Sequence, residues 1–265
     1  MSKINGTFLK LHDQVGKFPP QYYNTNEFDR TISLVDCVTE GCSERSDTYK
    51  FSSDDEIRSR IGAIDPADKE LFFVESNSAH HLSAFLAQSA IDNMPKDDDG
   101  KTPGALVVNF DQHDDHGTPG SKLFCGNWSG HVSCDYLVIG LKNKTEAHFY
   151  KYGESKYTVY TLEQYKDLFE DYEQIYVTVD MDVLTNGASK RTNWGAGDMT
   201  KEKLIELLSD LPGDKLVAAD ITGFPPNKNG DADELASYIN DITDTAKALC
   251  NIMGRPLTSD TETQN

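Results

Sequence analysis

Two short apolar runs, each ending in closely spaced aspartates, constrain this chain more than any other feature. The first run, Ala105–Phe110, is rich in valine, which indicates a buried strand, and it leads directly into Asp111, His113 and Asp115. Because side chains alternate along an extended chain, these three groups face the same side. Taken alone, the stretch also fits a solvated acidic loop.

The second run, residues 174–184, has the same design, because a strand-like segment ends in Asp180 and Asp182. Two buried strands that both present carboxylates at their carboxyl ends form a site at the edge of a parallel sheet. Mixed oxygen and nitrogen ligands suit Mn²⁺ better than a cation that prefers thiolates. The two runs together therefore predict a metal site.

This pair of motifs, in this order, resembles the two metal motifs of the ureohydrolases, the arginase and agmatinase superfamily. The resemblance extends from about residue 71 to the last expected helix. It implies a cofactor of two Mn²⁺ ions per chain and hydrolysis of a guanidino group to urea and an amine. The substrate would then be a guanidino compound.

The resemblance also implies a ligand set. Asp111 and Asp180 would bridge both ions. One ion would be completed by an early histidine and Asp115, and the other by His113 and Asp182. Four aspartates would balance the four positive charges of two Mn²⁺ ions. Asp115 is in addition a catalytic candidate, since it would orient the hydroxide that two metals generate from a shared water.

The early histidine is expected at His80 or His81, where a predicted strand (71–74) meets a helix-prone stretch (82–90). The family has Gly-Gly-Asp-His-Ser at this junction, and this sequence keeps only a histidine. The distance from the strand end slightly favours His80. We expect one of the two histidines to bind metal and the other to pack or to support it.

Residues 126–131 resemble the family's Gly-Asn-x-His-Gly loop, whose histidine is a proton shuttle. His131 is therefore the second catalytic candidate, with His116 behind it. An ordinary loop histidine is an equally good interpretation of His131.

Two departures from the family pattern bear on the substrate. After the last strand the family has Asp-x-x-Glu, whereas here Gly223 follows Asp220 at the Glu position. The acids that bind the α-amino group of free arginine are replaced by residues 142–145 (Lys-Asn-Lys-Thr). An arginine-containing peptide, converted to its ornithine form, fits these losses best. Small substrates of the agmatine or formimidoyl type stay open as alternatives to the peptide. Two other classes of protein also stay open: a one-metal amidohydrolase or deacetylase, and a catalytically silent arginase-like binding protein.

Strands that alternate with helices predict an α/β fold, a three-layer αβα arrangement around a central, mostly parallel sheet. With 265 residues we expect a single domain, 1–265, with a disordered polar tail at 257–265. Residues 31–36 are the expected first strand. Thr161 is expected to cap a helix over 161–169.

Composition narrows the partners. The net charge of −19, from 44 acidic and 25 basic residues, argues against nucleic acid and anionic membranes. It would attract a cationic ligand, although solubility alone also explains it. Five cysteines without metal-binding spacing predict free thiols in a reducing compartment. No apolar leader or membrane span is evident, so we expect a cytoplasmic protein, with a homo-oligomer left open.

Overall fold

The computed structural model describes residues 4–11, 28–40, 50–93, 104–117, 121–185, 194–223 and 232–255. The predicted tail at 257–265 lies outside these residues. The helices are α1 (Asp54–Ile61), α2 (Leu82–Asp92), α3 (Lys201–Ser209) and α4 (Ala232–Ile252). The strands are β1 (Ile4–Lys10), β2 (Phe28–Ser33), β3 (Val38–Glu40), β4 (Lys50–Phe51), β5 (Glu70–Val74), β6 (Ala105–Phe110), β7 (Asp135–Ile139), β8 (Glu146–Tyr150), β9 (Tyr157–Thr161), β10 (Gln174–Asp180) and β11 (Leu216–Thr222).

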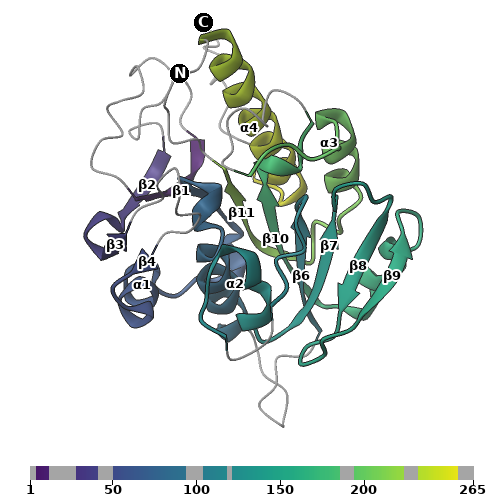
Figure 1. Ribbon diagram of the computed structural model, residues 1–265, viewed down its shortest axis with the longest axis horizontal. Coiled ribbons are helices and arrows are strands. Elements are labelled where there is room, and N and C mark those ends of the chain that lie inside the picture. The colour runs from purple at the N-terminus through teal and green to yellow at the C-terminus, as the bar shows by residue number, and fades with distance from the viewer. Residues whose placement is uncertain are drawn as a thin grey trace, which may run out of the picture.

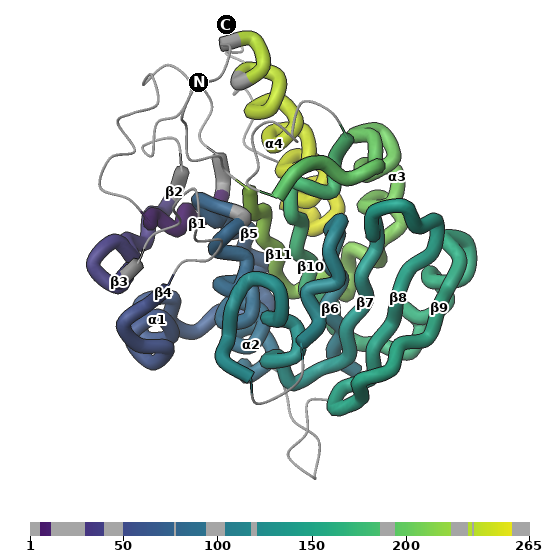
Figure 2. Tube along the Cα trace, viewed as in Figure 1, coloured from purple at the N-terminus to yellow at the C-terminus, as the bar shows by residue number. Residues whose placement is uncertain are grey.

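A nine-stranded sheet with the order β2-β1-β5-β11-β10-β6-β7-β8-β9 forms the centre of the described structure (Figure 1). All neighbours from β2 to β7 pair in parallel. The last two strands, β8 and β9, extend the sheet in antiparallel fashion, at the end opposite β2. The expected mostly parallel sheet is confirmed. A separate pair, β3 and β4, lies near α1 (Figure 2).

Two apolar cores lie on opposite faces of the sheet, because alternate strand residues point to opposite sides. Phe73 and Val108 belong to the core that includes buried residues of α3 and α4. Their chain neighbours Phe72 and Val107 belong to the core that includes buried residues of α1 and α2. Helices therefore cover both faces, and the expected three-layer αβα architecture is confirmed.

The amino-terminal strands and one helix differ from expectation. The segment expected to be the first strand is β2, which ends at Ser33, and β1 precedes it in the chain. Thr161 accepts a hydrogen bond from the Gln164 backbone N–H at 3.3 Å, as a capping residue would. However, Thr161 also ends β9, and the helix that follows is a 3₁₀ helix over Tyr165–Asp171. The β-branched and aromatic residues before Thr161 favour pairing with β8 over a longer helix.

The cysteines of the described part of the chain are free and buried, which agrees with the expectation of free thiols. They are Cys37, Cys125, Cys134 and Cys250. Among the described helices, none combines the length and the apolar character that a membrane crossing requires.

Candidate metal centre

Two neighbouring strands present the aspartates of both motifs at one edge of the sheet. Phe110 of β6 pairs with Val179 of β10, so that Asp111 and Asp180 follow at adjacent positions. Each aspartate also closes its own turn. The Asp111 carboxylate accepts the backbone N–H of His113 at 2.7 Å, and the Asp180 carboxylate accepts that of Asp182 at 2.9 Å. These local hydrogen bonds explain why an acid at the strand end bends the chain immediately afterwards.

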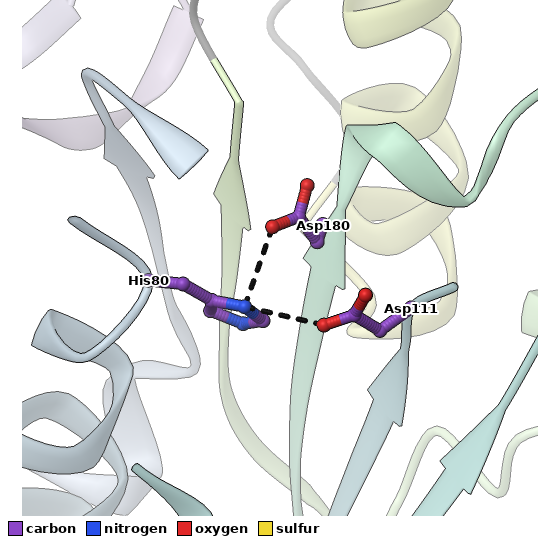
Figure 3. Close-up of side chains that lie close together, drawn as sticks. All are labelled: His80, Asp111 and Asp180. Carbon is purple, nitrogen blue, oxygen red and sulfur yellow. Dashed lines mark ion pairs between the residues drawn. The ribbon is translucent and has the colours of Figure 1, made fainter. Parts of the chain in front are cut away.

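His80 reaches this pair of strands from the far side of β11. After β5 the chain makes a 3₁₀ turn, Asn77–Ala79, which precedes His80. The His80 Nδ1 atom lies 3.3 Å from a carboxylate oxygen of Asp111 and 3.3 Å from one of Asp180 (Figure 3). It lies 3.0 Å from an oxygen of Asp115. One imidazole nitrogen therefore faces three carboxylates.

A second group of ligand atoms adjoins the first. His113 Nδ1 lies 3.3 Å from Asp111 and 3.3 Å from Asp182. Two sets of side chains with ligand atoms within 4.8 Å of one another result, one of His80, Asp111 and Asp180, the other of Asp111, His113 and Asp182. Asp111 belongs to both sets, as a bridging ligand would. Asp180 belongs to the first set, and its bridging role stays a prediction.

The other nitrogen of His80 is held by a buried network. His80 Nε2 lies 3.1 Å from Thr178 Oγ1, and that hydroxyl donates to Asp220 at 2.9 Å. Since the Thr178 hydroxyl has one proton and gives it to Asp220, it accepts the N–H of His80 Nε2. In the neutral imidazole, which is the form that binds a metal, His80 Nδ1 then has a lone pair directed at the aspartates. Sequence reasoning missed Thr178, although it lies two residues before Asp180 and therefore on the same face of β10.

Asp115 is held by contacts from the loop after the first motif. The Trp128 Nε1–H donates to its carboxylate at 3.0 Å, and the Ser129 hydroxyl donates to its backbone carbonyl at 2.9 Å. The backbone of Asp115 has a φ of 51°, a left-handed conformation that few residues other than glycine adopt. Strained backbone of this kind persists where surrounding contacts fix it, as they do here.

The cluster is strongly coupled electrostatically. Burial lowers the pKa of His80, but hydrogen bonds to Asp111 and Asp115 outweigh it and raise this pKa well above its usual range. Burial also lowers the pKa of His113, but hydrogen bonds to Asp111 and Asp182 outweigh this effect and raise the pKa to about 11. Burial and the charge of Asp111 raise the pKa of Asp115 to about 7. Without a cation, protons on the imidazoles offset the carboxylate charges, and a bound cation would replace those protons.

His81 does not join the cluster. Its side chain is buried and its ring centroid lies 5.2 Å from that of Phe51. Burial and the neighbouring His80 lower the pKa of His81 to about 3. It lines a separate cavity of about 200 Å³ whose other lining residues are Lys50, Phe51, Asp54, Lys122, Leu123 and Phe124. The structure therefore brings His80, and not His81, to the aspartates.

The described contacts of the two candidate proton shuttles, His131 and His116, are with residues other than the aspartate ligand candidates. Burial lowers the pKa of His131, and the charged group that opposes this is Asp54 of α1. His116 Nδ1 lies 3.1 Å from the Ser129 hydroxyl, and its ring stacks on Tyr150 with centroids 3.9 Å apart. Neither histidine has a contact with the aspartate ligand candidates among the described interactions. Residues 126–131 instead supply Trp128, which holds Asp115.

The donor atoms fit a divalent metal such as Mn²⁺. Apart from their contacts inside the cluster, His80 Nδ1 and both carboxylate oxygens of Asp182 are buried without a hydrogen-bond partner among the described residues. Buried charged and polar groups are costly unless they are paired or coordinate a metal. Imidazole and carboxylate ligands without thiolates favour Mn²⁺ and similar cations over softer ones.

Solved structures of ureohydrolases share this fold. The chain is similar to proclavaminate amidino hydrolase from Streptomyces clavuligerus, with a TM-score of 0.56 and 14% identity over 95% of this chain and 92% of that chain. Formimidoylglutamase from Bacillus subtilis gives a TM-score of 0.55 and 12% identity, over 96% and 88%. Entamoeba histolytica arginase gives 0.54 and 12%, over 93% and 99%. The chain therefore has the arginase/agmatinase ureohydrolase fold.

Sequence comparison alone adds little to this assignment. No protein-family model matches the chain. An uncharacterized protein from Thermotoga maritima is 26% identical over 172 residues, which is 62% of this chain and 62% of that relative. The match thus spans less than two thirds of the relative's length, and the assignment depends on the fold and the clustered side chains.

Proposed function

We propose that this protein is a binuclear manganese hydrolase that cleaves a guanidino group, releasing urea and leaving an amine. The observation that supports this most strongly is the pair of adjoining histidine–aspartate sets that share Asp111. A single metal would need one such set. A catalytically silent relative would have no need of buried ligand atoms without hydrogen-bond partners.

The chain's own residues have distinct roles in this proposal. His80, Asp111, Asp115 and Asp180 would hold one ion, and His113 and Asp182 would complete the second site with the two bridging aspartates. When bound, two divalent cations supply the acidity that makes hydroxide available at neutral pH. Asp115 would accept a hydrogen bond from this nucleophile and orient it, and Trp128 fixes the Asp115 carboxylate. His131, with His116 behind it, stays the proton-shuttle candidate that the resemblance of residues 126–131 implies.

An arginine within a peptide is the substrate that we propose first. Gly223 has a φ of 114°, and a Cβ there would lie 3.0 Å from Met181 Cβ and 3.1 Å from the Tyr238 hydroxyl. A glutamate at this position would therefore be strained by the backbone and crowded by its neighbours, and this chain has no acid there to pair with the guanidinium. Residues 142–145 supply no acid for an α-amino group. A site without these acids loses little when the amino group is blocked in a peptide bond.

One contact favours a second candidate, a small guanidino substrate with a free amino group. The Asp198 carboxylate accepts the Asn143 backbone N–H at 2.7 Å, so an exposed acid lies beside the 142–145 turn. The likeness in fold to an amidino hydrolase and to formimidoylglutamase supports the same class. In this case Asp198 would provide the acid that the turn itself lacks.

Urea release from matched substrates tests both candidates. The Mn²⁺-loaded protein is incubated with free arginine, with agmatine, and with a peptide that contains one arginine linked by peptide bonds on both sides. The urea released and the mass of the peptide are then measured. We expect a higher kcat/KM for the peptide, with its arginine converted to ornithine, and no urea from Asp111→Ala or Asp180→Ala. If only agmatine or free arginine releases urea, a small guanidino compound, and not a peptide, is the substrate. No urea from any guanidino compound would overturn the proposed activity.

A further inference from the structure

The candidate metal centre is open to solvent at His113. The His113 side chain is 40% exposed, whereas those of its partners Asp111 and Asp182 are 0% exposed. Trp194 lies next to this opening, with its ring centroid 6.0 Å from that of His113 and the rings at 74°. Its exposed fraction is 37%, against 0% for Trp128. A ligand that approaches the cluster along this side therefore passes the Trp194 indole.

The segment that begins with Trp194 is fixed to the metal centre by its backbone. The Gln112 side-chain amide donates to the Trp194 carbonyl at 3.3 Å. The Gly197 N–H donates to the Asp182 carbonyl at 2.6 Å. A Cβ at Gly197 would lie 2.1 Å from the Val183 carbonyl oxygen, so only glycine permits this close approach. These contacts fix the segment of Trp194 to the ligand candidate Asp182 and to Gln112, which lies between Asp111 and His113 in the chain.

A guanidinium substrate needs a partner that the usual position cannot provide. Gly223 supplies no acidic side chain, and its φ of 114° would strain one. The aspartates of the cluster are occupied when they bind cations. The face of an indole is the strongest aromatic partner for a cation, and a planar guanidinium stacks on it as well. An exposed, fixed indole at the opening of the cluster meets this requirement.

From this placement we infer that Trp194 recognises the substrate guanidinium through the face of its indole. The residue would select a planar cation over a neutral ligand of the same shape. This inference rests on the proposed function, because it assigns the specificity of the same site. It makes Trp194 a binding residue that acts before the hydrolytic step.

Binding of a charged and a neutral ligand separates this role from simple apolar contact. Calorimetric titration of the Mn²⁺-loaded protein with butylguanidinium and with its neutral isostere butylurea gives both affinities. Trp194→Leu keeps an apolar side chain but removes the aromatic π face, and Trp194→Phe keeps an aromatic face that attracts a cation less strongly. Tyr152→Leu is the control, because Tyr152 is an aromatic residue that is 60% exposed. We expect butylguanidinium affinity to fall about three- to thirty-fold in Trp194→Leu. Trp194→Phe should lie between, and Tyr152→Leu should match the unaltered protein.

Butylurea affinity should change less than about two-fold in every variant. Unchanged butylguanidinium affinity in Trp194→Leu, or an equal loss for both ligands, would overturn the inference, as would an unaltered protein that does not bind butylguanidinium. Urea release distinguishes the two proposals. A protein that binds butylguanidinium through Trp194 but releases no urea from any guanidino compound refutes the activity alone. A Trp194→Leu variant that releases urea with an unchanged KM refutes the role of Trp194 alone.

Discussion

Replacing Thr178 by valine should weaken metal binding although Thr178 has no place among the ligands. The substitution keeps the shape of the side chain and removes the hydroxyl that accepts from His80 Nε2 and donates to Asp220. His80 then loses the hydrogen bond that selects its tautomer and fixes its ring. Removing such a support of a ligand costs about 10- to 100-fold in metal affinity or activity.

Folding stability should fall in the same variant. Asp220 is fully buried and accepts hydrogen bonds from Ser83, Thr178 and Tyr176. Loss of one partner of a buried carboxylate costs about 1–3 kcal/mol. Chemical denaturation of the metal-free protein would measure this cost separately from the metal.

Thr178→Ser is the matched control, because it keeps the hydroxyl and loses only a methyl group, at about 1 kcal/mol. Calorimetric titration with Mn²⁺ should give near-normal affinity for Thr178→Ser and a loss of about one to two orders of magnitude for Thr178→Val. Equal Mn²⁺ affinity in Thr178→Val and the unaltered protein would refute the supporting network.

Four further substitutions test individual contacts. In elemental analysis, His80→Ala should have lost bound Mn²⁺, whereas His81→Ala should keep it, because His81 lines a separate cavity. Similar losses of Mn²⁺ in both variants would contradict the assignment of His80 as the ligand. Trp128→Phe should lower urea release with little change in metal content, since it removes the donor to Asp115, and normal turnover would dismiss this role. Gly223→Ala should lower the free energy of unfolding by about 1–3 kcal/mol in urea denaturation, because a Cβ meets Met181, and unchanged stability would show that the position has room.

The sequence was sufficient to predict the centre of the fold and the aspartates of the cluster. Continuous apolar runs such as Ala105–Phe110 identify strands buried on both faces, and an acid at the end of each run marks the carboxyl edge of the sheet. Parallel pairing of β6 and β10 then brings Asp111 and Asp180 together. These features depend on the local sequence pattern and on one rule of topology, that the carboxyl ends of parallel strands lie at the same edge of the sheet.

Contacts between distant segments could not be read from the sequence. His80 and His81 are adjacent, and the distance from the strand end favours His80 only slightly. The path of the chain through the 3₁₀ turn before them cannot be predicted from this pattern. Trp194 precedes the helix α3 in the chain, and its place beside His113 depends on backbone contacts with residues 182–183. The strand β1 was missed because its sequence, Ile-Asn-Gly-Thr-Phe-Leu-Lys, has neither a continuous apolar run nor a regular alternation.

The number of Mn²⁺ ions bound per chain tests the central claim most directly. Elemental analysis of the folded protein at saturating Mn²⁺, after removal of free metal, gives this number. We predict two ions per chain in the unaltered protein, because two ligand sets share Asp111, and loss of both in Asp111→Ala. One ion per chain, or none, in a correctly folded protein would contradict a binuclear hydrolase.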